Sequence, residues 1–90
     1  MKIVIICSLS QKDNIDSIVE IYKKLGHMVD HPIEQPDKDV SRVIEDYLYR
    51  IAMADAVVAI TKDDGSFDIE QTYELAFARF LKKPINVIDG

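Results

Sequence analysis

The sequence has a single cysteine, no cluster of basic residues and no long apolar segment, and each shortage excludes a class of protein. One cysteine, Cys7, cannot form an internal disulfide, which fits a reducing compartment. The apolar run that follows Met1 ends at Cys7, too early for a membrane span or a secretory signal. The net charge is −5, which disfavours nucleic acid and anionic membranes as partners. We therefore expect a cytoplasmic protein without nucleic-acid or membrane partners.

The length bounds the number of domains and the stability that one copy can reach. We expect the 90 residues to form one domain, residues 1–90, because the chain cannot enclose two cores. A chain this short buries only about 60% of its unfolded surface. Shared apolar surface between copies would add to that burial, so we predict a homodimer or higher homo-oligomer. The acidic balance remains compatible with a small nucleoside or nucleotide as ligand.

Short apolar runs alternate with amphipathic stretches along the chain. The apolar runs are typical of strands, mostly buried on both faces, and cover residues 2–7, 27–30, 56–60 and 85–88. The amphipathic stretches predict three helices: one from Ser10 to Gly26, one starting at Asp37 or Asp39, and one from Asp68 to Pro84. The order βαβαβαβ predicts an α/β fold, a three-layer flavodoxin- or Rossmann-like sandwich. Its sheet has four parallel strands in the order 2-1-3-4.

The third predicted helix has a clear apolar periodicity. The residues that we expect to form its buried face are Ile69, Tyr73, Ala76, Phe77 and Phe80. Asp68 and Gln71 have the spacing of an N-cap and its N3 partner. Tyr49, in the second helix, falls outside the apolar stripe of that helix and is expected on the surface or at an interface.

Two acids stand where an open parallel sheet places its ligands, beyond the carboxyl ends of the strands. Asp68 begins the third helix, and Glu74 lies about 9 Å further along its axis at 1.5 Å per residue. Two carboxylates in one cleft can act as nucleophile and proton donor if their surroundings separate their pKa values. The simpler interpretation, a helix cap and a solvated surface acid, stays open on spacing alone. Asp55, at the opposite end of the third strand, is expected to be structural.

Several segments resemble the nucleoside 2-deoxyribosyltransferase family over residues 54–88. They are Ala54-Asp55-Ala56-Val57-Val58-Ala59-Ile60, Asp68, Tyr73-Glu74-Leu75-Ala76-Phe77-Ala78 and Lys83-Pro84-Ile85. The resemblance implies that Glu74 is a nucleophile that attacks the anomeric carbon of a (deoxy)nucleoside or nucleotide. It also implies that Asp68 protonates the leaving base or tunes Glu74. Transfer or hydrolysis of the N-glycosidic bond would then need no cofactor.

Four further polar residues are candidate substrate-binding groups. Ser8 and Ser10 follow the first strand, where a ribose hydroxyl or phosphate can dock at a helix N-terminus, although both can equally be capping hydroxyls. Asp64 and Ser66 lie in the polar loop 61–67, which leads from the third strand to the helix that carries Glu74.

Two other functions compete with glycosyl transfer. The first is a non-catalytic module that binds a nucleotide-derived ligand in the same place. The second and weaker one is a phosphocysteine carrier that uses Cys7, for which an inert buried thiol is the simpler interpretation. His27 and His31 flank a short strand without other ligand residues nearby, so we expect no metal site.

Overall fold

The computed structural model describes residues 1–8, 12–31 and 40–89. Within these ranges strands alternate with helices, as predicted. The strands are β1 (Lys2–Ile6), β2 (Met28–Asp30), β3 (Ala56–Ile60) and β4 (Ile85–Ile88), and the helices are α1 (Lys12–Lys24), α2 (Val40–Met53) and α3 (Ile69–Phe80). The expected caps Ser10, Asp37 and Asp39 lie outside the described residues.

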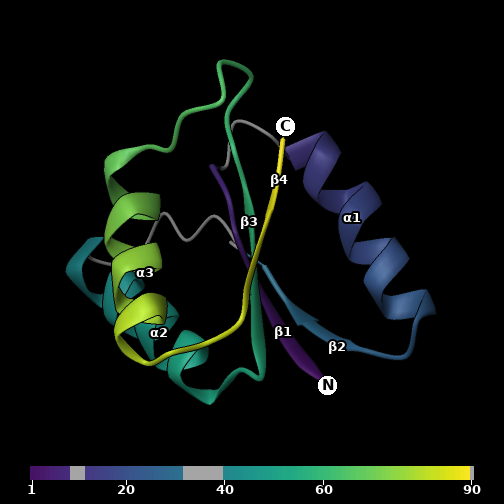
Figure 1. Ribbon diagram of the computed structural model, residues 1–90, viewed down its shortest axis with the longest axis horizontal. Coiled ribbons are helices and arrows are strands. Elements are labelled where there is room, and N and C mark those ends of the chain that lie inside the picture. Colours follow the sequence, from purple (N-terminus) through teal and green to yellow (C-terminus); the bar gives the residue numbers. More distant parts are fainter. Residues whose placement is uncertain (9–11, 32–39, 90) are drawn as a thin grey trace.

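The strands pair in parallel in the order β2-β1-β3-β4, which confirms the predicted topology. Figure 1 shows α1 on one face of this sheet and α2 with α3 on the other, so the molecule has three layers. Because every strand runs the same way, all carboxyl ends meet at one edge of the sheet. The loop of residues 61–67 and the first turn of α3 lie at that edge (Figure 1).

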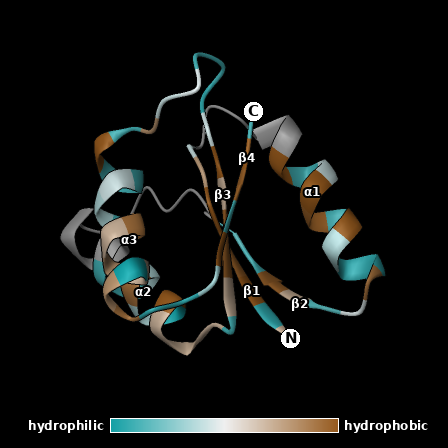
Figure 2. Ribbon diagram, viewed as in Figure 1, coloured by the Kyte–Doolittle hydropathy of each residue, from teal (hydrophilic) through white to brown (hydrophobic). Residues whose placement is uncertain are grey.

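The middle strands β1 and β3 are buried on both faces because successive side chains point into opposite layers. One cluster, between the sheet and α2 with α3, contains Val4, Ile6, Tyr47, Ile51, Ala54, Val57, Ala59, Leu75 and Ala78. The second, between the sheet and α1, contains Ile3, Ile5, Cys7, Ile15, Val19, Val58 and Ile60. Figure 2 shows apolar residues along these strands and hydrophilic ones at the tip of the loop 61–67. The continuous apolar runs in the sequence thus correspond to strands with a core on either side.

Asp55 joins the amino ends of the two central strands, far from the edge where ligands bind. The Lys2 backbone N–H donates to Asp55 Oδ2 at 2.8 Å, and the Asp55 N–H donates to the Lys2 carbonyl at 2.8 Å. These two bonds support the structural role expected for Asp55.

The predicted buried face of α3 is wrong in its main residues. Ile69, Tyr73, Ala76 and Phe80 are exposed and Phe77 is half-buried. The side chains that α3 buries are Gln71, Leu75 and Ala78. The apolar stripe that the periodicity selected therefore faces away from the sheet, and the buried side includes Gln71, whose contacts are described below. The predicted surface position of Tyr49 is confirmed.

Candidate functional site

The candidate site is built where β1 and β3 end and α3 begins. Cys7 follows β1 directly, Thr61 follows β3, and both are buried. Asp68 and Glu74 come from α3, which packs against the same two strands. Residues far apart in the sequence are therefore brought together at the carboxyl edge of the sheet.

Asp68 caps α3, as its spacing from Gln71 predicted. Its backbone is extended, with φ −76° and ψ 176°, and its Oδ1 accepts the Gln71 backbone N–H at 2.8 Å. In return, Gln71 Oε1 accepts the Asp68 N–H at 3.1 Å. This reciprocal pair is a capping box. It holds the half-buried Asp68 carboxylate at the N-terminus of α3, near the ends of the central strands.

The side chain of Gln71 does more than the capping pattern predicted. Only 1% of this residue is exposed, and its Nε2 donates to the carbonyl of Ile60 at 2.9 Å and to that of Ile6 at 3.4 Å. Those carbonyls belong to the last residues of β3 and β1. One amide group thus ties the first turn of α3 to both central strands. The only signal in the sequence was the Asp68 to Gln71 spacing, which gives no hint of the strand partners.

Glu74 lies one turn beyond Gln71 and is half-buried rather than extended into water. Burial, followed by the negative charges of Glu70 and Asp68, raises the pKa of the Glu74 carboxyl from 4.5 to about 8. Desolvation and like charge both disfavour a carboxylate. A carboxyl group with a strongly raised pKa at a sheet edge is characteristic of a functional site. Glu74 is accordingly not the solvated surface acid of the simpler interpretation.

Tyr47 and Cys7 lie within electrostatic range of Glu74. The Tyr47 hydroxyl donates to the Ile5 carbonyl, and burial followed by the charge of Glu74 raises the Tyr47 pKa well above its usual value. Burial, then Glu74, then Asp68 raise the pKa of the Cys7 thiol to about 12. At neutral pH both groups therefore stay protonated. A protonated, buried thiol fits the inert role expected for Cys7 and argues against a phosphocysteine carrier.

Two of the four predicted substrate-binding residues, Asp64 and Ser66, bind each other. Asp64 Oδ1 accepts the Ser66 backbone N–H at 2.9 Å and the Ser66 hydroxyl at 2.6 Å, in an exposed turn. These bonds from Ser66 lower the pKa of Asp64. The Lys62 N–H donates to the Ser66 carbonyl at 2.8 Å, and Gly65 takes a φ of +80° that favours glycine. Ser8 follows β1 at the site edge, and Ser10 lies outside the described residues.

In residues 1–8, 12–31 and 40–89, no group of three or more His, Cys, Asp or Glu side chains is arranged to hold a metal ion. None of the helices described there has the length and apolar character needed to cross a membrane.

Comparison with solved structures identifies the fold of this chain. No protein-family model matches the sequence, and no curated protein matches it. Three solved structures align with 99% of the chain. A 2-deoxyribosyltransferase from Bacillus psychrosaccharolyticus is 21% identical, with a TM-score of 0.77 over 72% of its own length. The chain has the nucleoside deoxyribosyltransferase fold.

The other two structures extend that likeness beyond one enzyme. The Leishmania mexicana 2-desoxiribosyltransferase is 14% identical, with a TM-score of 0.79 over 65% of that chain. The CMP N-glycosidase BcmB from Clostridium botulinum is also 14% identical, with a TM-score of 0.71 over 71% of that chain. The resemblance read from residues 54–88 is thereby confirmed at the level of fold.

Proposed function

We propose that this protein cleaves or transfers the N-glycosidic bond of a (deoxy)nucleoside or nucleotide, with Glu74 as nucleophile and Asp68 as its acidic partner. The observation that carries this proposal is the environment of Glu74. It is a half-buried carboxyl group whose pKa is raised to about 8, beside Asp68 at the carboxyl edge of a parallel sheet. The fold shared with two deoxyribosyltransferases and an N-glycosidase supports the same chemistry.

The reaction proceeds by double displacement at the anomeric carbon. A Glu74 carboxylate oxygen forms a bond to C1′ as the bond from C1′ to the base nitrogen breaks. The electron pair of that bond goes to the base, which takes up a proton at a ring nitrogen from water, while the charge of Asp68 raises the pKa of Glu74. A second base or a water then attacks C1′, the ester bond to Glu74 breaks, and the attacking base or water loses a proton to solvent.

The raised pKa sets the pH at which this chemistry runs. Attack requires the Glu74 carboxylate, and a group with a pKa of about 8 is mostly protonated at pH 7. Desolvation makes the remaining carboxylate more reactive, because water does not stabilise it. We therefore expect kcat/KM to rise with pH through about 8, where half of Glu74 is ionised in the free enzyme, and to level off above that pH.

Four polar residues are proposed to contact the sugar, phosphate or base of the substrate, with the loop 61–67 approaching when substrate binds. They are Ser8, Ser10, Asp64 and Ser66. The partner is a small nucleoside or nucleotide, and the single cysteine favours the cytoplasm. We also propose that the protein is a homodimer or higher homo-oligomer, because one copy leaves many large apolar side chains exposed.

One observation favours a second function, binding without turnover. A protonated Glu74 can donate a hydrogen bond to a ligand but cannot attack it. A module that recognises a nucleotide-derived ligand through a neutral carboxyl group would use the same edge of the sheet.

Product analysis distinguishes the two functions. The protein is incubated at pH 8 with deoxyinosine, deoxyadenosine or cytidine monophosphate, with and without a free acceptor base, and products are separated by chromatography. The decisive variant is Glu74→Gln, and the matched control is Glu70→Gln, an exposed acid one turn earlier in the same helix. We expect Glu74→Gln to lose at least about a thousandfold in rate, as for loss of a nucleophile, while Glu70→Gln retains activity.

The intermediate gives an independent readout. Mass spectrometry of acid-quenched protein should reveal the sugar bound to the peptide that contains Glu74, and no such adduct in Glu74→Gln. Turnover that survives Glu74→Gln contradicts the assigned nucleophile. A ligand-induced rise in Tm without any product in the wild type supports the binding module instead.

A further inference from the structure

The outward side of α3 carries an apolar stripe that no other described part of the chain covers. It consists of Ile69, Tyr73, Ala76 and Phe80, and the three large side chains are 75%, 65% and 81% exposed. The spacing of four, three and four residues keeps them on one side of the helix, over about 16 Å of its length. These residues look like a core face in the sequence, and in the structure they face away from the core.

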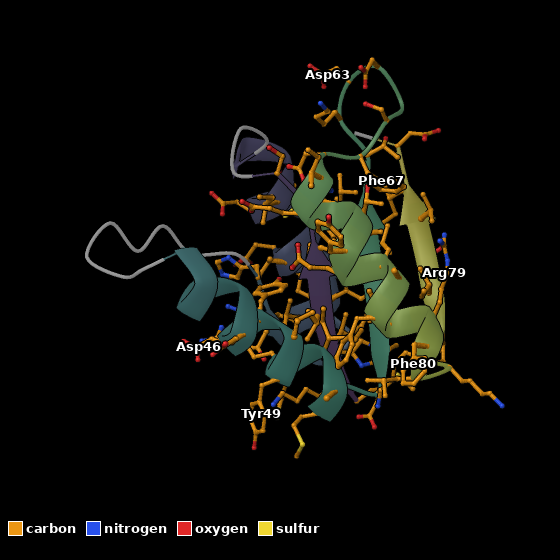
Figure 3. The ribbon with its side chains drawn as sticks, turned by 90° about the vertical axis from the view of Figure 1, so that its left-hand side faces the viewer. Asp46, Tyr49, Asp63, Phe67, Arg79 and Phe80 are labelled. Carbon is orange, nitrogen blue, oxygen red and sulfur yellow. The ribbon has the colours of Figure 1, made fainter. Side chains whose placement is uncertain are left out.

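The neighbouring helix extends this apolar surface. Tyr49 and Met53 of α2 are also exposed, and Figure 3 shows α2 and α3 side by side with Tyr49 and Phe80 toward the same end. Taking about 150–250 Å² for a large side chain, the five large exposed residues of the two helices present roughly 600 Å². A stable interface buries about 800 Å² per partner, of which about 65% is apolar in homodimers. The available apolar area therefore matches what one homodimer interface needs.

The order of residues along α3 is itself symmetric. The spacing of four, three and four reads the same in both directions, with its centre between Glu74 and Leu75. In an antiparallel pair of such helices, Ile69 would face Phe80 of the partner subunit, and Tyr73 would face Ala76 of the partner subunit. A large ring would then lie opposite a small methyl group, the alternation that close helix packing requires. A two-fold axis produces both contacts twice.

From these observations we infer that the outward face of α3, extended by Tyr49 and Met53, binds a second copy of this chain, with the two α3 helices antiparallel. The inference deepens the proposed homodimer by naming its face and its register. The interface would also lie next to the candidate site of each copy, because Tyr73 precedes Glu74 on the same helix. Pairing would stabilise the helix that contains Glu74 and is capped by Asp68.

A rival face exists on the other side of the molecule. Ile21 of α1 and Leu25, which directly follows that helix, are exposed one turn apart, and Met28 begins the edge strand β2. These two residues make a shorter stripe than the four of α3, and α1 is the one described helix in its layer (Figure 1). This face supplies the matched control, since Leu25 is 67% exposed, close to the value for Tyr73.

Sedimentation equilibrium tests the inference over a protein concentration range from micromolar to about 100 µM. We expect the wild type to have twice the chain mass of 10.3 kDa, the double variant Ile69→Lys/Phe80→Lys to have the monomer mass, and Leu25→Lys to remain dimeric. The two lysines bring each copy from −5 to −5 + 2 = −3. General repulsion between copies therefore falls, and dissociation can be assigned to the face itself. Circular dichroism checks that each variant is folded.

The outcomes separate this inference from the proposed homodimer. A dimer that persists in Ile69→Lys/Phe80→Lys and dissociates in Leu25→Lys overturns the α3 face but leaves the homodimer standing. A wild type of monomer mass at every concentration overturns both, and the α3 face would then serve a different protein.

Cysteine cross-linking tests the antiparallel register in folded protein. Tyr73→Cys and Ala76→Cys are prepared separately, mixed and oxidised, with the buried Cys7 left in place. We expect the mixed pair to cross-link several-fold faster than either variant alone, because residues 73 and 76 of opposite copies face each other. Equal rates for the mixture and for Tyr73→Cys alone contradict the register. Ile21→Cys mixed with Leu25→Cys is the control and should stay uncross-linked.

Discussion

Glu74 combines a buried position with negative neighbours, and its protonation is coupled to folding. Its pKa in the folded chain, about 8, lies above the ordinary value of 4.5. Between these two pH values the unfolded chain gives up the proton while the folded chain keeps it. The contribution of protonated Glu74 to the free energy of unfolding is therefore fully present below pH 4.5 and is lost as pH rises through about 8. The proposed active site thus costs the fold stability at the pH at which it would act.

We predict that Glu74→Gln stabilises the protein at high pH. At pH 8.5 the variant should exceed the wild type in free energy of unfolding by about 2 kcal/mol, because an uncharged amide replaces a buried carboxylate. At pH 4 the two should be nearly equal, since Glu74 is then protonated in both states. Urea unfolding at both pH values measures the difference. A gain of the same size at pH 4 would indicate a packing effect and contradict the assigned pKa.

Gln71 is the residue whose importance the sequence conceals. We predict that Gln71→Leu lowers the free energy of unfolding by about 3 kcal/mol, because it removes the cap partner and leaves the Ile6 and Ile60 carbonyls without this donor. It should also lower the pKa of Glu74 toward 4.5, since a loosened first turn admits water. Carbon-detected NMR titration of the Glu74 carboxyl measures this without any need for turnover.

Thr72 supplies the matched control for Gln71. Its hydroxyl donates to the Asp68 carbonyl at 2.8 Å in the same turn, at an exposed position. Thr72→Val should change the free energy of unfolding by less than about 0.5 kcal/mol and leave the Glu74 titration in place. A Glu74 pKa that stays near 8 in folded Gln71→Leu would mean that Gln71 does not position this carboxyl group.

At the scale of the elements, the positions of strands and helices follow from local sequence patterns, but the face that a helix buries does not. The apolar runs located β3 and β4 to the residue because a strand buried on both faces has a composition unlike its surroundings. For α3, periodicity selected an apolar stripe that faces away from the sheet. The buried side includes Gln71, whose hydrogen bonds reach strands up to 65 positions away in the sequence. Such contacts have no local signature.

The same reason explains what the sequence revealed of the site. Asp68 and Glu74 became candidates because they follow the junction of strand and helix, where parallel sheets bind ligands, and their proposed roles come from the family resemblance. The proximity of Cys7 and Tyr47 to Glu74 depends on how three elements pack. The mutual pairing of Asp64 and Ser66 in an exposed turn was likewise hidden, since spacing does not tell which partner a polar side chain takes.

The end of α3 offers a test of backbone conformation. Lys82 has a φ of 58°, in the left-handed region, and its N–H donates to the Arg79 carbonyl at 3.0 Å as the helix closes. We predict that Lys82→Gly raises the free energy of unfolding by about 0.5–1 kcal/mol, because glycine adopts this conformation without steric cost. Thermal unfolding measures the gain, and Lys83→Gly is the control that should not gain. Destabilisation by Lys82→Gly would mean that the side chain contributes more than the backbone costs.

At the scale of the whole molecule, charge and apolar surface oppose each other. Each copy has a net charge of −5, so two copies repel, and the proposed interface on α3 opposes that repulsion. We predict that raising NaCl from 50 to 500 mM strengthens the dimer several-fold in Kd, since salt screens the repulsion and leaves apolar burial intact. Sedimentation at both salt concentrations measures the change. A dimer that weakens in salt would instead be held by ion pairs, at a face other than the apolar one.

The parallel sheet also determines at which end a tag can be attached without obstructing the proposed site. The strand that opens the chain starts at the amino edge, and β4 finishes at the carboxyl edge, so the two ends marked in Figure 1 lie on opposite sides. An affinity tag or surface anchor joined to the amino end would lie at the amino edge of the sheet, away from the proposed site. The same group attached after β4 would lie over the proposed substrate entrance. Immobilisation through the amino end of the chain is therefore the orientation that leaves the proposed site open to substrate.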